Sequence, residues 1–295
     1  MGAAGVLQGV SAASIAVLLG EYQNVIRNLA GLRLNTKAVM SPETRNVTSS
    51  TQYLFLLFII IGVVAGVVIV RPHFAVVTHE YPVLASCFFL GLMLMAAFLW
   101  LRKVTRWTPG VVLCLVAGIG AAFGLTCVRP IITPDNPLAA AVTGALAGTT
   151  FMLPGVSDVF IAMFFAKYRY ILASFGSLEF DVIIPFIAAG IFGALAVARL
   201  LAKLLEAYYN PIVALLGGWM IGSLNRIWPW RQVVEFTTTI EGDRIPAFEK
   251  SIMPWRYLQI TGKDPHLFHA ILIVASGVFM VVLIEKIAAR LKTKR

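Results

Sequence analysis

Apolar residues occur along the chain in long blocks that short polar segments separate. A helix needs about 20 such residues to cross the hydrocarbon core of a bilayer. Six blocks are suited to crossing as single helices: 53–70, 83–101, 110–128, 182–205, 211–227 and 267–287. The pattern therefore predicts an all-α polytopic membrane protein.

Two further apolar blocks contain helix-breaking residues. The block 1–32 is interrupted at Gly9-Val10-Ser11, and the block 138–175 is interrupted at Pro154-Gly155-Val156-Ser157. Proline removes a helix hydrogen bond and glycine loosens the backbone, so each block is expected to break into two short arms. We interpret both blocks as re-entrant helical hairpins.

The two interrupted blocks match each other when the first is shifted by 146 positions. Identical residues then coincide: Leu7 with Leu153, Gly9 with Gly155, Val10 with Val156, Ser11 with Ser157, Ile15 with Ile161, Ala16 with Ala162 and Tyr22 with Tyr168. The shift is about half the chain, as a duplication predicts. We therefore expect a first repeat over 1–130 and a second over 131–295, each made of one hairpin and three spans. Three crossings between the motifs would invert the second repeat relative to the first.

Composition supports a membrane environment. Residues of the AVILMFWYC set make up 59% of the chain, and charged residues make up 13%, about half the share in soluble domains. The net charge of +10 arises from loops and the C-terminal tail, and its distribution favours both termini in the cytoplasm. No basic face suited to nucleic acid is evident. The N-terminus lacks the basic segment of a cleaved signal peptide.

Few residues are suited to forming disulfides or binding a metal. Cys87, Cys114 and Cys127 fall in apolar blocks, where cysteine behaves as a small buried hydrophobe. No His, Cys and carboxylate cluster has metal-ligand spacing, so neither a metal nor a cofactor is expected.

The broken hairpins are the main candidate site. A helix break in a membrane leaves backbone groups without partners, and it persists only when it is buried or lines a polar cavity. A half-helix after the break directs N–H groups at it, which suits an anion. Ser11 and Ser157 could cap those half-helices or donate to a phosphate. In the simpler interpretation, Gly-x-Ser only allows close helix packing.

Other polar residues extend the candidate site. Asp158 has no acidic counterpart in the first motif, and it could carry a coupling proton or cap the second half-helix. Arg199 could pair with an anionic substrate or extend to the cytoplasmic interface. The complete substrate-binding set is Gly9, Ser11, Ser14, Pro154, Gly155, Ser157, Asp158, Arg199 and Ser223.

Several segments together resemble one family. They are Met1-Gly2-Ala3-Ala4, Gly9-Val10-Ser11, Gly144-x3-Gly148, Met152-Leu153-Pro154-Gly155-Val156-Ser157, Lys167-Tyr168, Ile221-Gly222-Ser223-Leu224, Ile227-Trp228-Pro229-Trp230 and Ile284-Glu285-Lys286. Over essentially the whole chain, these segments resemble the undecaprenyl-phosphate translocase family of bacterial and archaeal cytoplasmic membranes. The chain departs from the family pattern at Gly5, Gln8, Ala12 and Ala13, at Met95-Ala96, at Asp158-Val159 and at Ala166.

The resemblance implies a function. Members of that family return the polyprenyl-phosphate carrier to the inner leaflet for cell-envelope synthesis, so we expect a flippase whose partners are this lipid, the surrounding membrane lipids and a coupling proton or sodium ion. An ion-coupled transporter of a small anion would use the same hairpins. An intramembrane serine hydrolase would need a base near Ser157, and the four histidines, His73, His79, His266 and His269, lie in loops or at a span end. We therefore expect no enzymatic activity.

Overall fold

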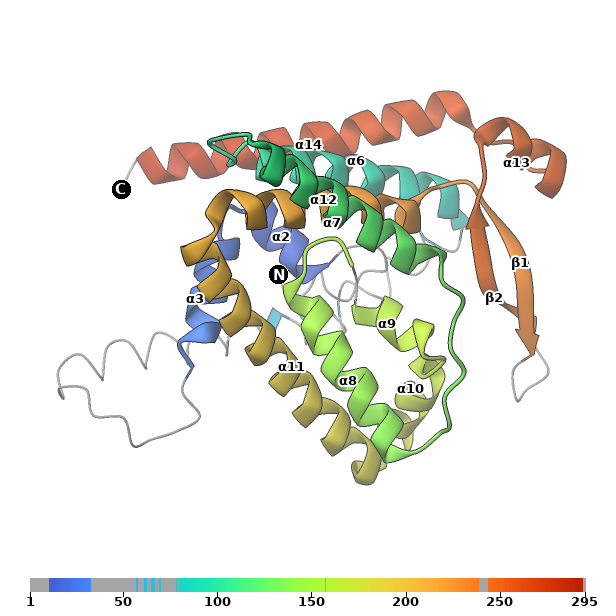
Figure 1. The fold of residues 1–295 in the computed structure, drawn as a ribbon. Helices are drawn as coiled ribbons and strands as arrows, with labels where there is room; N and C mark the ends of the chain where they lie inside the picture. The colour runs from blue at the N-terminus through green and yellow to red at the C-terminus, as the bar shows by residue number, and fades with distance from the viewer. Residues whose placement is uncertain are drawn as a thin grey trace, which may run out of the picture. The chain divides into compact units, whose positions relative to one another are not determined.

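A computed structural model of the chain describes residues 11–32, 81–156, 158–238 and 244–293, together with single positions between 57 and 80 (Figure 1). The predicted span 53–70 and the predicted first arm before Ser11 therefore lie largely outside the described residues. The boundary near residue 130 divides the two predicted repeats, and it stays a prediction.

The described residues are mostly helical. The helices are α2 (Ala12–Leu18), α3 (Tyr22–Ala30), α6 (Pro82–Leu101), α7 (Pro109–Cys127), α8 (Pro137–Met152), α9 (Asp158–Phe164), α10 (Tyr168–Ser177), α11 (Phe180–Ala207), α12 (Tyr209–Ile227), α13 (Pro254–Thr261) and α14 (Leu267–Thr293). Within the described residues, α6, α7, α11 and the 267–286 part of α14 are long and apolar enough to cross a membrane. The chain is a mostly helical, multi-pass membrane protein.

The predicted spans agree closely with these helices. The spans 83–101, 110–128, 182–205 and 211–227 each begin within two residues of α6, α7, α11 and α12, and 267–287 begins with α14. Residues at the N-termini determine where several of these helices begin. Proline occupies the first turn of α6, α7 and α8, where its missing N–H costs no hydrogen bond. Thr108 and Asn136 cap α7 and α8 with their side-chain oxygens.

The second interrupted block contains three helices rather than the two arms expected. A first break separates α8 from α9 at Leu153–Val156, as predicted, and a second separates α9 from α10 around Ala166. Ala166 has φ +54°, a left-handed conformation that alanine rarely adopts. The second break was missed because neither proline nor glycine marks it.

The first block has the same local pattern where it is described. Shifted by 146 positions, α2 coincides with α9 at both ends, and α3 coincides with α10 to within one residue. Gly20, with φ +72°, then coincides with Ala166. The N–H of Gly20 donates to the Val17 carbonyl, and the N–H of Ala166 donates to the equivalent carbonyl of Met163.

A β-hairpin departs from the all-α prediction. Strands β1 (Arg231–Thr238) and β2 (Arg244–Ser251) pair antiparallel, with Arg231 opposite Ser251, inside the polar segment before α14 (Figure 1). The short helix α13 follows and ends at Gly262, which has φ +67°. Such a short polar hairpin has little hydrophobic pattern of its own, which is why no strand was predicted there.

The chain forms two compact units, each of which takes residues from both predicted repeats. The first unit contains 1–75, 135–162 and 169–209. In it α11 packs against α8 and α3. The α8 and α11 backbones touch through glycines: a Cβ added to Gly144, Gly148 or Gly193 would collide with a carbonyl oxygen of the opposite helix. Small residues allow this separation, which is characteristic of helix pairs in membranes.

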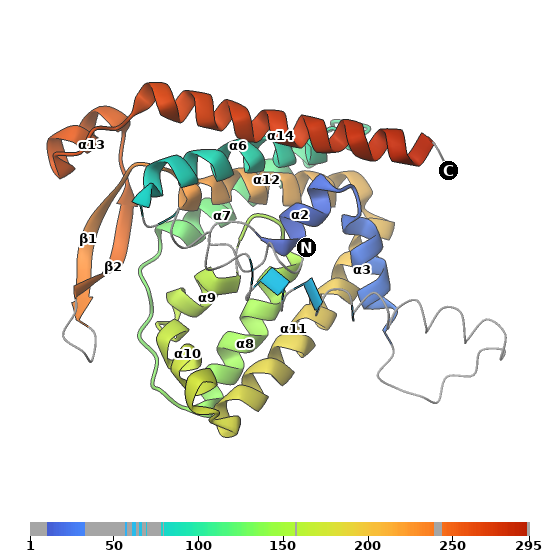
Figure 2. The ribbon, with the colours of Figure 1, turned by 180° about the vertical axis from the view of Figure 1, so that it is seen from behind.

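The second unit contains 76–134, 163–168 and 210–295. In it α14 runs along α6 (Figure 2), with Gly91 against the Val274 carbonyl. Gly118 and Gly222 likewise place α7 directly against α12. Trp100 of α6 donates its indole N–H to the Val213 carbonyl of α12 at 3.0 Å. The unit is therefore held by close backbone contacts and a few buried polar bonds.

Replacing Gly148 by alanine should destabilise the first unit. The added methyl would collide with the Gly190 carbonyl and force α8 away from α11, at a cost of about 1–3 kcal/mol. The matched control is Gly176→Ala in α10, where nothing lies within 4 Å of the added carbon. We expect a lower thermal unfolding midpoint in detergent for Gly148→Ala alone. Equal midpoints would contradict the close approach.

Candidate functional site

The candidate site is the break that follows α8. This helix ends at Met152, and the cap residue Leu153 is already extended, with φ −91° and ψ 124°. Pro154 cannot donate a backbone hydrogen bond, and Gly155 has φ +106°, which residues with a side chain rarely adopt. Pro154, Gly155 and Val156 are all buried. The break therefore places free backbone groups inside the protein.

Three side chains from the N-terminal segment bind those groups. The Tyr22 hydroxyl donates to the Met152 carbonyl at 2.7 Å. The Ser11 hydroxyl donates to the Leu153 carbonyl at 3.1 Å. The Gly155 N–H donates to the Ser14 hydroxyl oxygen at 2.9 Å. The structure thus brings Ser11 and Ser14 of the first motif into direct contact with the second motif.

Burial makes these hydrogen bonds energetically important. Ser11, Ser14 and Tyr22 expose 3%, 0% and 1% of their surface, so water cannot replace them. A buried peptide group without a partner costs about 1–3 kcal/mol. The Tyr22–Met152 and Ser14–Gly155 bonds are buried, whereas the Ser11–Leu153 bond is partly buried. Removing the Tyr22 or Ser14 hydroxyl would therefore leave such a group.

Ser11 and Ser14 differ in the hydrogen bonds that their hydroxyls can still form. Ser11 caps α2 by accepting from the Ala13 N–H at 3.2 Å, and its proton is already donated to Leu153. The Ser14 hydroxyl accepts from Gly155, and no acceptor for its own proton occurs among the described residues. Ser14 is fully buried in this arrangement, so its proton could reach a further acceptor, such as a phosphate oxygen, only where the break opens.

Arg199 lies in the same unit, on α11. Its guanidinium donates to the Leu32 carbonyl at 2.6 Å, just beyond the end of α3. A cation at a helix C-terminus complements the helix dipole and satisfies free carbonyls. In this structure Arg199 therefore connects α11 to α3.

Ser223 belongs to the other compact unit. It is fully buried in α12, and its hydroxyl donates to the Met220 carbonyl at 2.7 Å within the same helix. Two residues further on, the Asn225 amide donates to the Thr126 hydroxyl of α7 at 2.7 Å. These bonds give the polar end of α12 a packing role.

The remaining predicted site residues are less fully described. Gly9 and Ser157 lie outside the described residues, and Asp158 is described as the first residue of α9. Their roles stay predictions.

Sequence analysis missed Tyr22 as a site residue. Its match with Tyr168 was one of the identities that indicated duplication, and that match was the available signal. Lys167 was named only in the segment Lys167-Tyr168 that resembles the family, and not as a site residue. It is buried, and its ammonium group donates to the Thr133 carbonyl, which holds the segment before α8 against the end of α9.

Comparisons with known proteins agree on one family. The family described as "Undecaprenyl phosphate translocase-like" matches residues 1–245. A "Polyprenyl-phosphate transporter" of Vibrio cholerae serotype O1 is 25% identical over 295 residues, which cover 98% of this chain and 94% of the relative. No solved structure matches the chain.

Replacing Tyr22 by phenylalanine should destabilise the break. The change leaves the Met152 carbonyl buried without its donor and should cost about 1–3 kcal/mol of unfolding free energy. Tyr209→Phe is the matched control, because the Tyr209 hydroxyl accepts from Gln23 at an exposed position where water can substitute. We expect the control to change stability by less than about 0.5 kcal/mol. Similar unfolding midpoints in detergent for the two variants would show that the Tyr22 bond does not support the break.

Proposed function

The chain belongs to the undecaprenyl phosphate translocase-like family, and from this premise we propose that it moves a polyprenyl phosphate between the leaflets of the cytoplasmic membrane. The polyprenyl phosphate would return to the inner leaflet, where cell-envelope synthesis uses it again. The name of the Vibrio cholerae relative, which aligns over nearly the whole chain, supports the same substrate.

The contact between the two motifs is the observation that carries this proposal. A buried helix break must have partners for its backbone or line a polar path. Here Ser11, Ser14 and Tyr22 supply such partners, and the Ser14 proton would become available to an additional acceptor where the break opens. A phosphate group offers strong acceptors. We propose that the lipid phosphate passes at this contact, with Gly9 and Ser157 completing the path.

The equivalence of α2–α3 and α9–α10 supports an inverted-repeat mechanism. Transporters built from inverted repeats bind substrate between broken helices and expose the site to each side in turn. We propose that the hairpin 1–32 opens to the cytoplasm and the hairpin 138–175 to the opposite side, with both chain termini in the cytoplasm. The isoprenoid tail would stay in the bilayer during this exchange, so only the charged headgroup needs a polar path.

Coupling to an ion follows from electrostatics. Moving an anion toward an inside-negative potential costs about 2.3 kcal/mol per charge per 100 mV. A proton or sodium ion that moves with the phosphate removes this cost. Asp158 stands next to the second motif, and a carboxylate within a membrane marks a functional position. We propose Asp158 as the proton carrier.

Transport can be measured in proteoliposomes with a labelled polyprenyl phosphate whose accessibility is followed in each leaflet. We expect the protein to exchange the lipid between leaflets, and Gly155→Ala to abolish exchange because an alanine cannot hold φ +106° without strain. Gly176→Ala should retain exchange. Equal rates with and without protein would refute lipid transport, and uptake of inorganic phosphate instead would favour the small-anion transporter.

The coupling proposal has its own test. Asp158→Asn should remove the acceleration of transport by a pH gradient, because the amide cannot carry a proton. Asp181→Asn in the first turn of α11 makes the same chemical change at an exposed helix start and should keep the acceleration. If the gradient accelerates the Asp158→Asn protein as much as the unmodified protein, Asp158 is not the proton carrier.

A further inference from the structure

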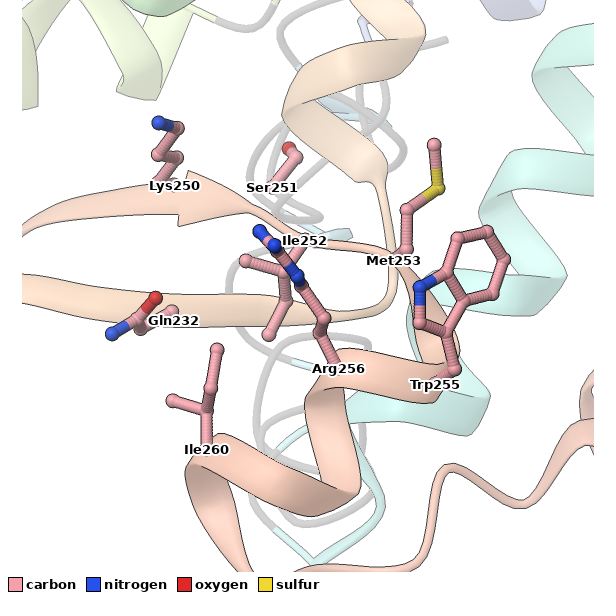
Figure 3. A pocket seen from close by; sticks show the side chains of 8 residues that line it. All are labelled: Gln232, Lys250, Ser251, Ile252, Met253, Trp255, Arg256 and Ile260. Atoms are coloured by element: carbon pink, nitrogen blue, oxygen red, sulfur yellow. The ribbon is translucent and has the colours of Figure 1, made fainter.

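The β-hairpin and α13 border an open cavity of about 410 Å³ (Figure 3). Gln232 and Lys250 face each other across the two strands, so both side chains lie on one face of the hairpin. Arg256 extends from α13 toward β2, and Trp255 and Ile260 line the α13 side. All of these residues belong to one compact unit.

The cavity carries positive charge. Lys250 and Arg256 both line it and are exposed, and its lining residues within the described part of the chain include no carboxylate. The carboxylate next to Lys250 in the chain, Glu249, already binds Arg231 at 2.8 Å. The Gln232 amide adds neutral donors. Two cations and an amide form a site for an anion with several acceptor oxygens, such as a phosphate.

Large exposed apolar side chains lie in the same segment as these cations. Met253, Trp255, Leu258 and Ile260 expose 52%, 67%, 52% and 45% of their surface. Exposed apolar side chains gathered on one short helix indicate an apolar contact surface. A free anion needs no such surface, whereas a lipid presents a phosphate and hydrocarbon together.

The chain also holds this cavity close to a membrane-spanning helix. Only five residues lie between the end of α13 at Thr261 and Leu267, where the membrane-spanning part of α14 begins, and this connection reaches at most about 20 Å. Trp230 donates to the Pro265 carbonyl at 3.0 Å, and Trp228 donates to the Ile252 carbonyl at 2.8 Å. Tryptophan is typical of the membrane interface. The occupant that meets this surface is therefore the bilayer.

We propose that β1, β2 and α13 form an interfacial binding site for the headgroup of a membrane lipid with a net negative phosphate. Lys250 and Arg256 bind the phosphate, Gln232 donates to it, and Trp255 and Ile260 contact the start of the acyl chains. The site is independent of the proposed transport function, and it stands if the chain moves another substrate.

The test uses the full chain in detergent, titrated with phosphatidylglycerol that carries bromine near its headgroup and quenches tryptophan fluorescence. The difference between the unmodified protein and Trp255→Phe isolates the signal of Trp255. Each basic residue near a membrane surface contributes about 1 kcal/mol to anionic lipid binding, or about fivefold in affinity. Lys250→Gln and Arg256→Gln should each weaken binding about fivefold, and the double variant about 25-fold.

Lys263→Gln is the matched control, because Lys263 is an exposed cation of the same segment that does not line the cavity. It should change affinity by less than twofold. Brominated phosphatidylcholine, whose phosphate is neutralised by choline, should bind at least tenfold more weakly than phosphatidylglycerol. The single variants decide the outcome if the double variant does not fold.

Three results would overturn the proposal. Equal binding of the two lipids would show that the cavity does not select an anionic headgroup. An equal loss for Lys263→Gln would show that the charge of the whole segment, rather than the cavity, attracts lipid. Displacement of the lipid by an equal concentration of inorganic phosphate would identify a site for free anions.

Discussion

The structure depends on how a helix break satisfies its backbone. After Met152 the chain leaves the helix, and Pro154 and Gly155 prevent it from continuing. The buried peptide groups left behind bind hydroxyls of the N-terminal segment rather than water. This requirement joins two segments about 140 residues apart in the chain and places Ser11 and Ser14 against Leu153 and Gly155 within one compact unit.

The longer helices form rigid pairs within each compact unit. In the α8–α11, α6–α14 and α7–α12 pairs, glycines let the backbones touch, and such contacts leave little room for sliding. The short helices α2, α3, α9 and α10 have few turns, and residues in the left-handed conformation, Gly20 and Ala166, interrupt them. For the transport mechanism proposed above, rigid pairs joined by short elements would allow the chain to adopt two arrangements.

The sequence predicted the long helices well because bilayer thickness imposes their length and lipid imposes their composition. It also predicted the break at Pro154 and Gly155, since both residues have strong backbone preferences. The bend at Ala166 escaped prediction because alanine favours helix, and tertiary context overrides that preference. The hairpin β1–β2 carries no strong hydrophobic alternation. Tyr22 could not be assigned because its partner is a backbone carbonyl, which side-chain patterns do not reveal.

The central claim is that the lipid phosphate is handled where the two motifs meet. The most direct measurement is photocrosslinking with a polyprenyl phosphate that carries a photoreactive group beside the phosphate, followed by mass spectrometry of the labelled peptides. The account predicts label in 11–22 and 152–158, and its loss when unlabelled polyprenyl phosphate competes. Saturable label confined to other segments, with none at either motif, would contradict it.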